Sequence, residues 1–142
     1  MVQIRKLTDM NAEHLDNYVE GINKIRSHYR WSDKIYDKSN LNHIYLVVFC
    51  NQVVGFFEAT VEDIDLRFKN CIHIFLHEIH FSGVAQGKGY GFEVLNYLLT
   101  KGHILKMVVV NENEAMNKLV NKFSIQKKFV SDNVTSYTIS LT

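Results

Sequence analysis

The segment that decides the fold reads CIHIFLHEIHF over residues 71–81 and continues as SGVAQGKGYG over residues 82–91. Its first part is rich in β-branched and aromatic residues, which favour a buried strand. Its second part is rich in glycine and leads into a helical stripe formed by Phe92, Leu95, Leu98 and Leu99. The segment is therefore predicted to form a strand, a glycine-rich loop and a helix.

The glycine-rich loop at 86–91 has the features of an anion-binding site. Unpaired N–H groups and the positive end of the helix dipole favour a negative charge at the start of a helix. Glycine permits a positive φ and a close approach of the backbone to a ligand. Lys88 adds a cation. A phosphate is the expected guest, and the alternative is a plain strand-to-helix turn that needs glycine only for its geometry.

Two common phosphate-binding motifs do not fit this loop. A P-loop requires GxxxxGK followed by Ser or Thr, but Gly83 and Gly87 are one residue too close together, and Gly89 occupies the place of the hydroxyl residue. A dinucleotide-binding loop requires GxGxxG, whereas residues 87–91 read GxGxG. Both interpretations are therefore rejected.

The rest of the chain alternates between strand and helix patterns. An N-terminal strand at 2–7 precedes a helical region at about 11–31, and Gly55 lies inside a later strand, where it indicates a bulge or a close backbone approach. Further strands are predicted at 43–50, 53–61, 104–110, 124–130 and 134–141, with a helix starting at Asn113. We expect one α/β domain over residues 1–142. Its mixed central sheet has about six to seven strands with an antiparallel N-terminal half, and about four helices flank it.

Composition narrows the class of protein. The chain has 142 residues, of which 46% are hydrophobic and 22% charged, and its net charge is +1. These values are typical of a globular protein and argue against a general nucleic-acid binder. No apolar run is long enough to span a membrane and the N-terminus lacks a secretory core, so we expect a cytoplasmic protein with no membrane partner.

Cysteine and histidine spacing gives no metal site. Cys50 and Cys71 lie in apolar runs without ligand spacing, and both are expected to be buried free thiols. His73, His77 and His80 fall on two faces of a strand, which argues against zinc.

The pattern Gln86-x-x-Gly89-x-Gly91, behind a strand that ends at Ile79-His80-Phe81, resembles the acyl-CoA loop of the GNAT superfamily of N-acetyltransferases. The order of the predicted elements is similar to that of the family over nearly the whole chain. A second family motif is matched only in part. Asn113 and Leu119 are in register, but Val120 replaces a Tyr and Ser124-Ile125 replaces Gly-Phe.

The resemblance implies that acetyl-CoA is the co-substrate. Its pyrophosphate would bind the amides of the loop, and its pantetheine arm would run along the end of the central strand. In the family this strand bulges and splays from its parallel neighbour. The residues expected to bind the cofactor are Ile79, His80, Phe81, Gln86, Gly87, Lys88, Gly89, Tyr90, Gly91 and Asn113.

The resemblance also points to a catalytic base on the central strand, four or six positions before Phe81, where this chain has His77 and Phe75. Histidine suits the task because it exchanges protons near neutral pH. His77 is therefore the first candidate. Glu78 is the second, because a bulge could change the face on which it lies. The alternative is that both are hydrogen-bonded groups of a half-covered sheet.

Val120 weakens the resemblance at one point, since an aliphatic side chain cannot protonate the departing thiolate as the family's Tyr does. Another hydroxyl or water would have to serve, or turnover would be slow or absent. The leading hypothesis is direct acetyl transfer from acetyl-CoA to an amine of a small molecule or a protein. A thiol intermediate is disfavoured because neither cysteine lies in an activating motif. The alternatives are a non-catalytic module that binds CoA or a partner and, as a weaker option, a nucleobase-modifying acyltransferase.

The acceptor is the least defined part. In the family it binds near the early helices and the last strands. Here a set of basic and aromatic side chains lies in the early region: Lys24, Arg26, His28, Tyr29, Arg30, Trp31, Lys34 and Tyr36. The solvated face of an amphipathic helix is the plainer explanation of this set. The sequence leaves a homodimer open.

Overall fold

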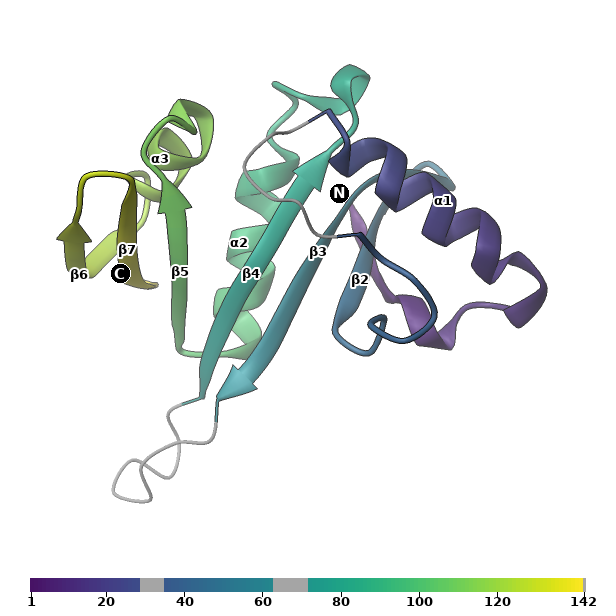
Figure 1. Ribbon diagram of the computed structural model, residues 1–142. Coiled ribbons are helices and arrows are strands. Elements are labelled where there is room, and N and C mark those ends of the chain that lie inside the picture. The colour runs from purple at the N-terminus through teal and green to yellow at the C-terminus, as the bar shows by residue number, and fades with distance from the viewer. Residues whose placement is uncertain (29–34, 63–71, 142) are drawn as a thin grey trace. The chain divides into compact units, whose positions relative to one another are not determined.

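The computed structural model describes residues 1–28, 35–62 and 72–141 (Figure 1). Within these residues the strands form a mixed sheet of seven strands. Their order is β1 (Gln3–Lys6), β2 (Ile44–Phe49), β3 (Gln52–Glu62), β4 (His73–Phe81), β5 (Ile104–Val110), β7 (Val134–Ser140) and β6 (Ser124–Val130). The expected α/β class and antiparallel first half are confirmed.

Three α-helices are found in the described parts of the chain, against the expected four: α1 (Leu15–Arg26), α2 (Tyr90–Lys101) and α3 (Glu114–Val120). Helix α1 runs without a break through Gly21 and is preceded by 3-10 helices at Leu7–Asp9 and Ala12–His14, while residues 29–31 of the predicted helical region lie outside the described residues. None of these helices is long and apolar enough to cross a membrane.

The chain divides into two compact units. One comprises Met1–Ala59 and Glu78–Tyr90, and the other comprises Thr60–His77 and Gly91–Thr142. Strands β3 and β4 therefore each contribute residues to both units. The expectation of a single domain over residues 1–142 stays a prediction.

The first unit contains β1, β2 and most of β3. Strands β2 and β3 are joined by Cys50 and Asn51, with φ angles of 50° and 63°. Positive φ at both positions is typical of a tight two-residue hairpin turn. Cys50 is exposed at this turn, so the expectation that it is buried was wrong. Its place at the tip of the hairpin explains the exposure. Cys71 lies outside the described residues.

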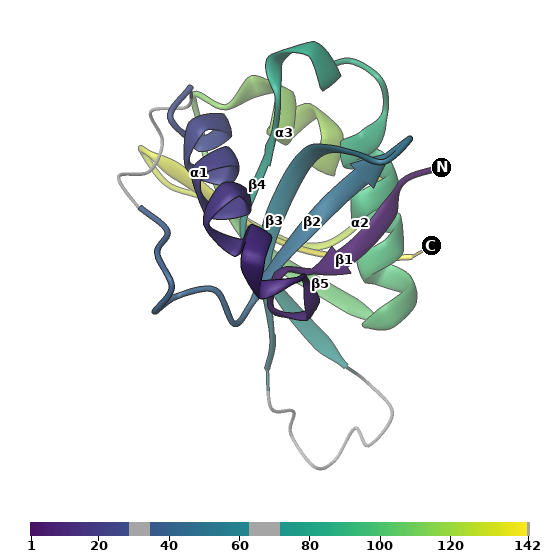
Figure 2. The ribbon, with the colours of Figure 1, turned by 90° about the vertical axis from the view of Figure 1, so that its right-hand side faces the viewer.

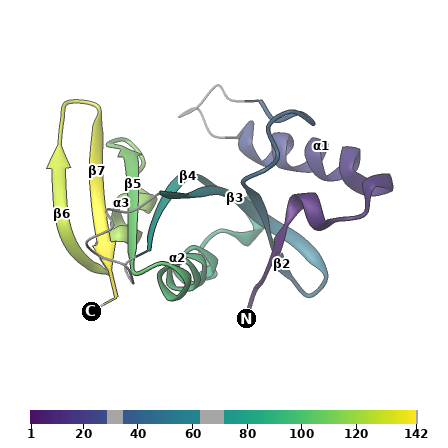
Figure 3. The ribbon, with the colours of Figure 1, turned by 90° about the horizontal axis from the view of Figure 1, so that it is seen from below.

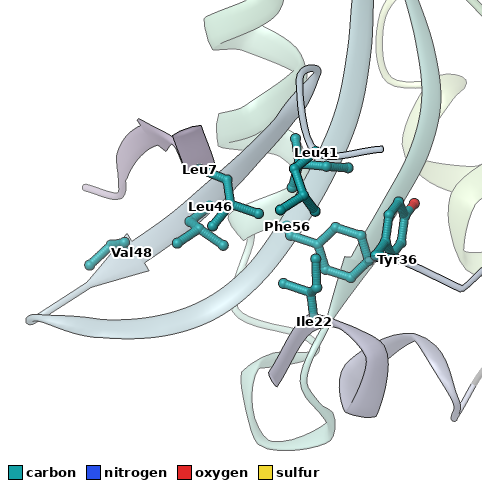
Figure 4. Close-up of a cluster of buried hydrophobic side chains, with 8 residues drawn as sticks. Leu7, Ile22, Tyr36, Leu41, Leu46, Val48 and Phe56 are labelled. Carbon is teal, nitrogen blue, oxygen red and sulfur yellow. The ribbon is translucent and has the colours of Figure 1, made fainter. Parts of the chain in front are cut away.

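Helix α1 covers one face of β2 and β3 in this unit (Figure 2). The three- and four-residue apolar spacing of the helix directs Ile22 into the core. Figure 4 shows this side chain beside Phe56 of β3 and Tyr36 from the segment after α1. The cluster is completed by Leu7, Leu41, Ile44, Leu46 and Val48. Burial of this apolar set holds α1 on the sheet.

The second unit contains β5, β7 and β6, which lie side by side in Figure 3. Residues 73–76 of β4 pair with residues 104–107 of β5 in parallel, as expected for a strand-helix-strand connection. Gly102 makes the turn into β5 possible, because an added Cβ would lie 2.6 Å from the Ile74 side chain.

Candidate functional site

The glycine-rich loop joins β4 to α2 as predicted. A 3-10 helix at Gly83–Ala85 leads to Gln86, which is extended, and α2 begins at Tyr90. Gly87 and Gly89 have φ angles of 77° and 82°, and nothing lies within 4 Å of a Cβ added at either. The two glycines are therefore required by backbone conformation and border open space.

Residues 86–89 of the loop are exposed, including Lys88. The first N–H groups of α2 have no partner within the helix, and its dipole points its positive end at the loop. Alternating left-handed glycines in such a loop turn successive N–H groups toward one side, which suits an anion. The loop therefore has the geometry of a phosphate site.

Tyr90 fixes the start of α2. Its side chain is buried, and its ring lies 5.4 Å from that of Phe49 and 6.3 Å from that of Phe81, centroid to centroid. These contacts anchor the beginning of the helix to the β2–β3 hairpin and to the end of β4. The predicted cofactor residue Tyr90 therefore acts in positioning the loop.

The end of β4 comes unusually close to β3. A Cβ at Gly55 would lie 2.5 Å from the carbonyl oxygen of His80 and 2.5 Å from Cδ1 of Phe81. The Ser82 N–H donates to the Val54 carbonyl at 2.9 Å. Pairing between β2 and β3 shifts register beside Gly55, as a bulge does. Both the bulge and the close approach predicted for this glycine are present, and they position Ile79, His80 and Phe81.

Burial along β4 follows the alternation of a strand, with Glu78 on the same side as His80. Ile74 and Leu76 are buried and His77 is exposed, and Glu78 and Ile79 are both half-buried. His77 Nε2 lies 2.8 Å from the Thr60 hydroxyl oxygen. His77, the first candidate base, is thus an exposed side chain that makes a hydrogen bond, whereas Glu78, the second candidate, is half-buried.

Glu78 belongs to a buried polar cluster in the first unit, which we define as Arg26, Tyr36, Glu58, Glu78 and His80. Its carboxylate is paired with His80 Nε2. The Tyr36 hydroxyl donates to Glu58 Oε1 at 3.4 Å. Burial raises the pKa of the Tyr36 phenol. The carboxylates of Glu78 and Glu58 raise this pKa further, and the charge of Arg26 lowers it. The phenol is therefore a neutral hydrogen-bond donor between charged groups.

Tyr36 is held in this cluster by α1. The Asn23 side chain donates to the Tyr36 carbonyl and accepts from the Tyr36 N–H, both at 2.8 Å. The Tyr36 ring packs edge-on against the Phe56 ring, with 5.4 Å between ring centroids, and Phe56 in turn contacts the His80 ring. Backbone and ring are thus both fixed.

Sequence reasoning named Arg26, Tyr36, Glu78 and His80 for different roles, and the structure brings them together. It missed Glu58, which is 8% exposed. The available signal was its position two residues after Phe56, on the face of a predicted strand that should be apolar. Tyr29, Arg30, Trp31 and Lys34 lie outside the described residues, while Lys24 and His28 are exposed.

In the second unit, Asn113 begins α3. Its side chain accepts the Met116 N–H at 3.2 Å, a capping role that accounts for Asn at this position. Val120 is fully buried near the end of the same helix. A phenol does reach α3 from β7, since the Tyr137 hydroxyl donates to Asn117 Oδ1 at 2.5 Å. Burial raises the pKa of Tyr137.

Within residues 1–28, 35–62 and 72–141, no group of three or more His, Cys, Asp or Glu side chains is arranged to hold a metal ion.

No protein-family model and no curated protein matches the sequence. Solved structures do match. A GNAT-family acetyltransferase from Streptococcus agalactiae superposes with a TM-score of 0.69 at 16% identity, covering 99% of this chain and 96% of that one. Arabidopsis thaliana NAA60 in complex with acetyl-CoA gives 0.65 at 10% identity and covers 98% of both chains.

Arabidopsis thaliana Naa50, solved with the bisubstrate analogue CoA-Ac-MVNAL, gives a TM-score of 0.64 at 14% identity and covers 99% of this chain and 98% of that chain. These similarities extend over essentially the full length of each chain and agree with the element order and the loop geometry described above. The chain therefore has the fold of the GNAT acetyltransferases.

Proposed function

We propose that this protein is an acetyl-CoA-dependent N-acetyltransferase that transfers the acetyl group directly to an amine. The observation that carries the proposal is the exposed loop at 86–89, with two left-handed glycines before the N-terminus of α2. Similar structures contain acetyl-CoA or a CoA-linked analogue, which supports the same ligand here.

The cofactor would bind in two parts. Amides from Gln86 to Gly91 bind the pyrophosphate, and Lys88 adds charge at the rim. The pantetheine arm follows the end of β4 at Ile79, His80 and Phe81, where its amides meet backbone groups of the strand. Gly55 supports this arrangement because it sets the position of the His80 carbonyl.

Transfer requires the amine nitrogen to attack the thioester carbonyl carbon while its proton is removed. A new C–N bond forms, the C–S bond breaks, and the sulfur leaves as thiolate. We assign the base to Glu78, with His77 as the competing assignment. The support is burial and contact, because Glu78 lies in the buried polar cluster and is paired with His80, whereas His77 is exposed.

The thiolate must then be protonated. Val120 has no proton to give and is fully buried. Water is assigned this role, and a backbone N–H near His80 stabilises the developing oxyanion. Val120 also favours the second candidate function, a module that binds CoA without turnover.

Two measurements separate these functions. Titration calorimetry with CoA and acetyl-CoA tests the loop, and release of free thiol in the presence of an amine panel tests transfer. We expect binding and thiol release. Binding without thiol release for any acceptor supports the module, and the absence of binding rejects both functions.

A further inference from the structure

Arg26, at the end of α1, is a buried arginine in which two guanidinium nitrogens lack hydrogen-bond partners. The residue is only 7% exposed. Its Nε and Nη2 atoms are buried and have no hydrogen-bond acceptor. In the described parts of the chain, the ion pairs found do not include Arg26. Such a buried charge is unusual, because arginine is almost never buried unless it is paired.

The two unpartnered nitrogens of Arg26 indicate which kind of acceptor group would bind them. Nε and one Nη form a fork that matches the two oxygens of a carboxylate. A buried donor without an acceptor costs roughly 1–3 kcal/mol, and more when it is charged. A carboxylate supplied by a ligand would remove this cost. The guanidinium edge therefore has the chemistry of a carboxylate site.

Arg26 also lies near Tyr36, whose surroundings include two carboxylates. Asn23, one turn earlier on the same face of α1, holds the Tyr36 backbone. The Tyr36 hydroxyl experiences the charges of Arg26, Glu58 and Glu78 together. A ligand with only a negative charge would be repelled by the two carboxylates. A ligand with only an amine would leave the guanidinium edge unsatisfied.

An amine that also carries a carboxylate satisfies both requirements. We propose that the acetyl acceptor is a free amino acid, whose carboxylate binds the Nε–Nη2 edge of Arg26 and whose amine is directed to Glu78. This inference rests on the proposed acetyltransferase function and names its substrate class. Arg26 is then a specificity-determining residue.

The test compares matched acceptors. Each of a set of amino acids is assayed beside its amide and its decarboxylated amine, by thiol release from acetyl-CoA. We expect kcat/KM to be at least about 100-fold higher for the preferred amino acid than for its amide or amine, since recognition of a buried charge is lost. Peptides that begin with Asp or Glu form a further arm, because they offer a carboxylate on a side chain.

Variants add a second comparison. Arg26→Met keeps an unbranched stem and is expected to raise KM for the amino acid at least tenfold while changing KM for the amine less than about twofold. Lys6→Met, at an exposed position of β1 in the same unit, makes the same charge change and is expected to leave both values unchanged. If Arg26→Met does not fold, the wild-type acceptor series decides alone.

Equal use of amino acids, amides and amines would overturn the inference while leaving the acetyltransferase intact. A preference for acidic peptides over free amino acids would also overturn it. If no acceptor is turned over but CoA binds, calorimetry with N-acetyl amino acids in the presence of CoA decides. If an N-acetyl amino acid binds the wild type but not the Arg26→Met variant, the result supports the carboxylate site. If it does not bind the wild type, the result rejects the site. Failure to bind CoA would instead reject the proposed function.

Discussion

Glu78 and His77 are neighbours in β4 but have different surroundings. Glu78 is half-buried and paired with His80, while His77 is exposed and hydrogen-bonded to Thr60. Adjacent residues of a strand ordinarily face opposite sides, so only one of the two lies in the buried polar cluster. The base can therefore be identified by changing one residue at a time.

We expect Glu78→Gln to lower kcat about 100-fold or more, within the range for loss of a general base, because the amide cannot accept the amine proton. His77→Gln is the matched control and should change kcat less than about threefold. Both variants should bind CoA as the wild type does in calorimetry. A large loss in His77→Gln with an active Glu78→Gln would return the assignment to His77.

Tyr36 should make the free energy of unfolding depend on pH in the alkaline range. Burial and the nearby carboxylates raise the pKa of its phenol above the value in the unfolded chain. For a group with a raised pKa in the folded state, the stabilisation is fully present below the unfolded pKa, about 10 for tyrosine, and is lost as pH rises above it. The free energy of unfolding should therefore fall more steeply above about pH 10 in the wild type than in Tyr36→Phe.

Urea unfolding at a series of alkaline pH values measures this difference. Tyr97→Phe, at a half-buried tyrosine of α2, corrects for the loss of one phenol. Parallel stability curves for the wild type and Tyr36→Phe would show that the phenol is not held neutral by the fold.

At the scale of elements, the approach of β3 to β4 depends on one missing side chain. Ala at position 55 would put Cβ within 2.5 Å of the His80 carbonyl oxygen, a backbone atom that cannot turn away. We expect Gly55→Ala to lower the free energy of unfolding by about 1–3 kcal/mol, as overpacking does. Because Ile79–Phe81 would shift, the affinity for CoA should fall as well.

Gly21 offers the matched control, since nothing lies within 4 Å of a Cβ added there. It lies inside α1, so Gly21→Ala should stabilise the protein by up to about 1 kcal/mol through helix propensity. Denaturant unfolding of the two variants measures whether the free energy of unfolding falls in Gly55→Ala and rises in Gly21→Ala. A Gly55→Ala variant as stable as the wild type would mean that β3 and β4 separate without cost.

Element order was predictable because local patterns specify it. Strands 104–110 and 124–130 agree with β5 and β6, and the strand, loop and helix around 71–99 agree with β4 and α2. The helical pattern at 11–31 was less accurate. Leu15–Arg26 form α1 as predicted, but Ala12–His14 form a 3-10 helix, whose apolar spacing is nearly the same, and residues 29–31 lie outside the described part of the chain.

At the scale of the whole molecule, ligand binding should be visible as stability. A ligand that binds only the folded chain stabilises it by RT ln(1 + [L]/Kd), about 2.7 kcal/mol at 100 times Kd. We expect this gain for CoA in the wild type, measured by thermal unfolding at several CoA concentrations.

The gain should be lost at the same CoA concentration in Gly89→Ala, because a φ of 82° is strained for alanine and the loop amides turn away. Gly83→Ala, at a loop glycine without a positive φ, should keep it. Equal stabilisation of all three proteins would move the CoA site away from the loop.

The sequence by itself determined the α/β class, the order of the strands and helices and the glycine-rich loop. Periodicity and glycine spacing are local properties, and each segment expresses them without knowledge of its neighbours. Only the tertiary structure decided the contents of the buried polar cluster. Arg26, Tyr36, Glu58 and Glu78 come from four separate segments, and burial and charge are set by the contacts between those segments. The sequence ranked His77 above Glu78 on the resemblance and on the chemistry of histidine, and only the contacts of the folded chain show that Glu78 is paired with His80 while His77 is exposed.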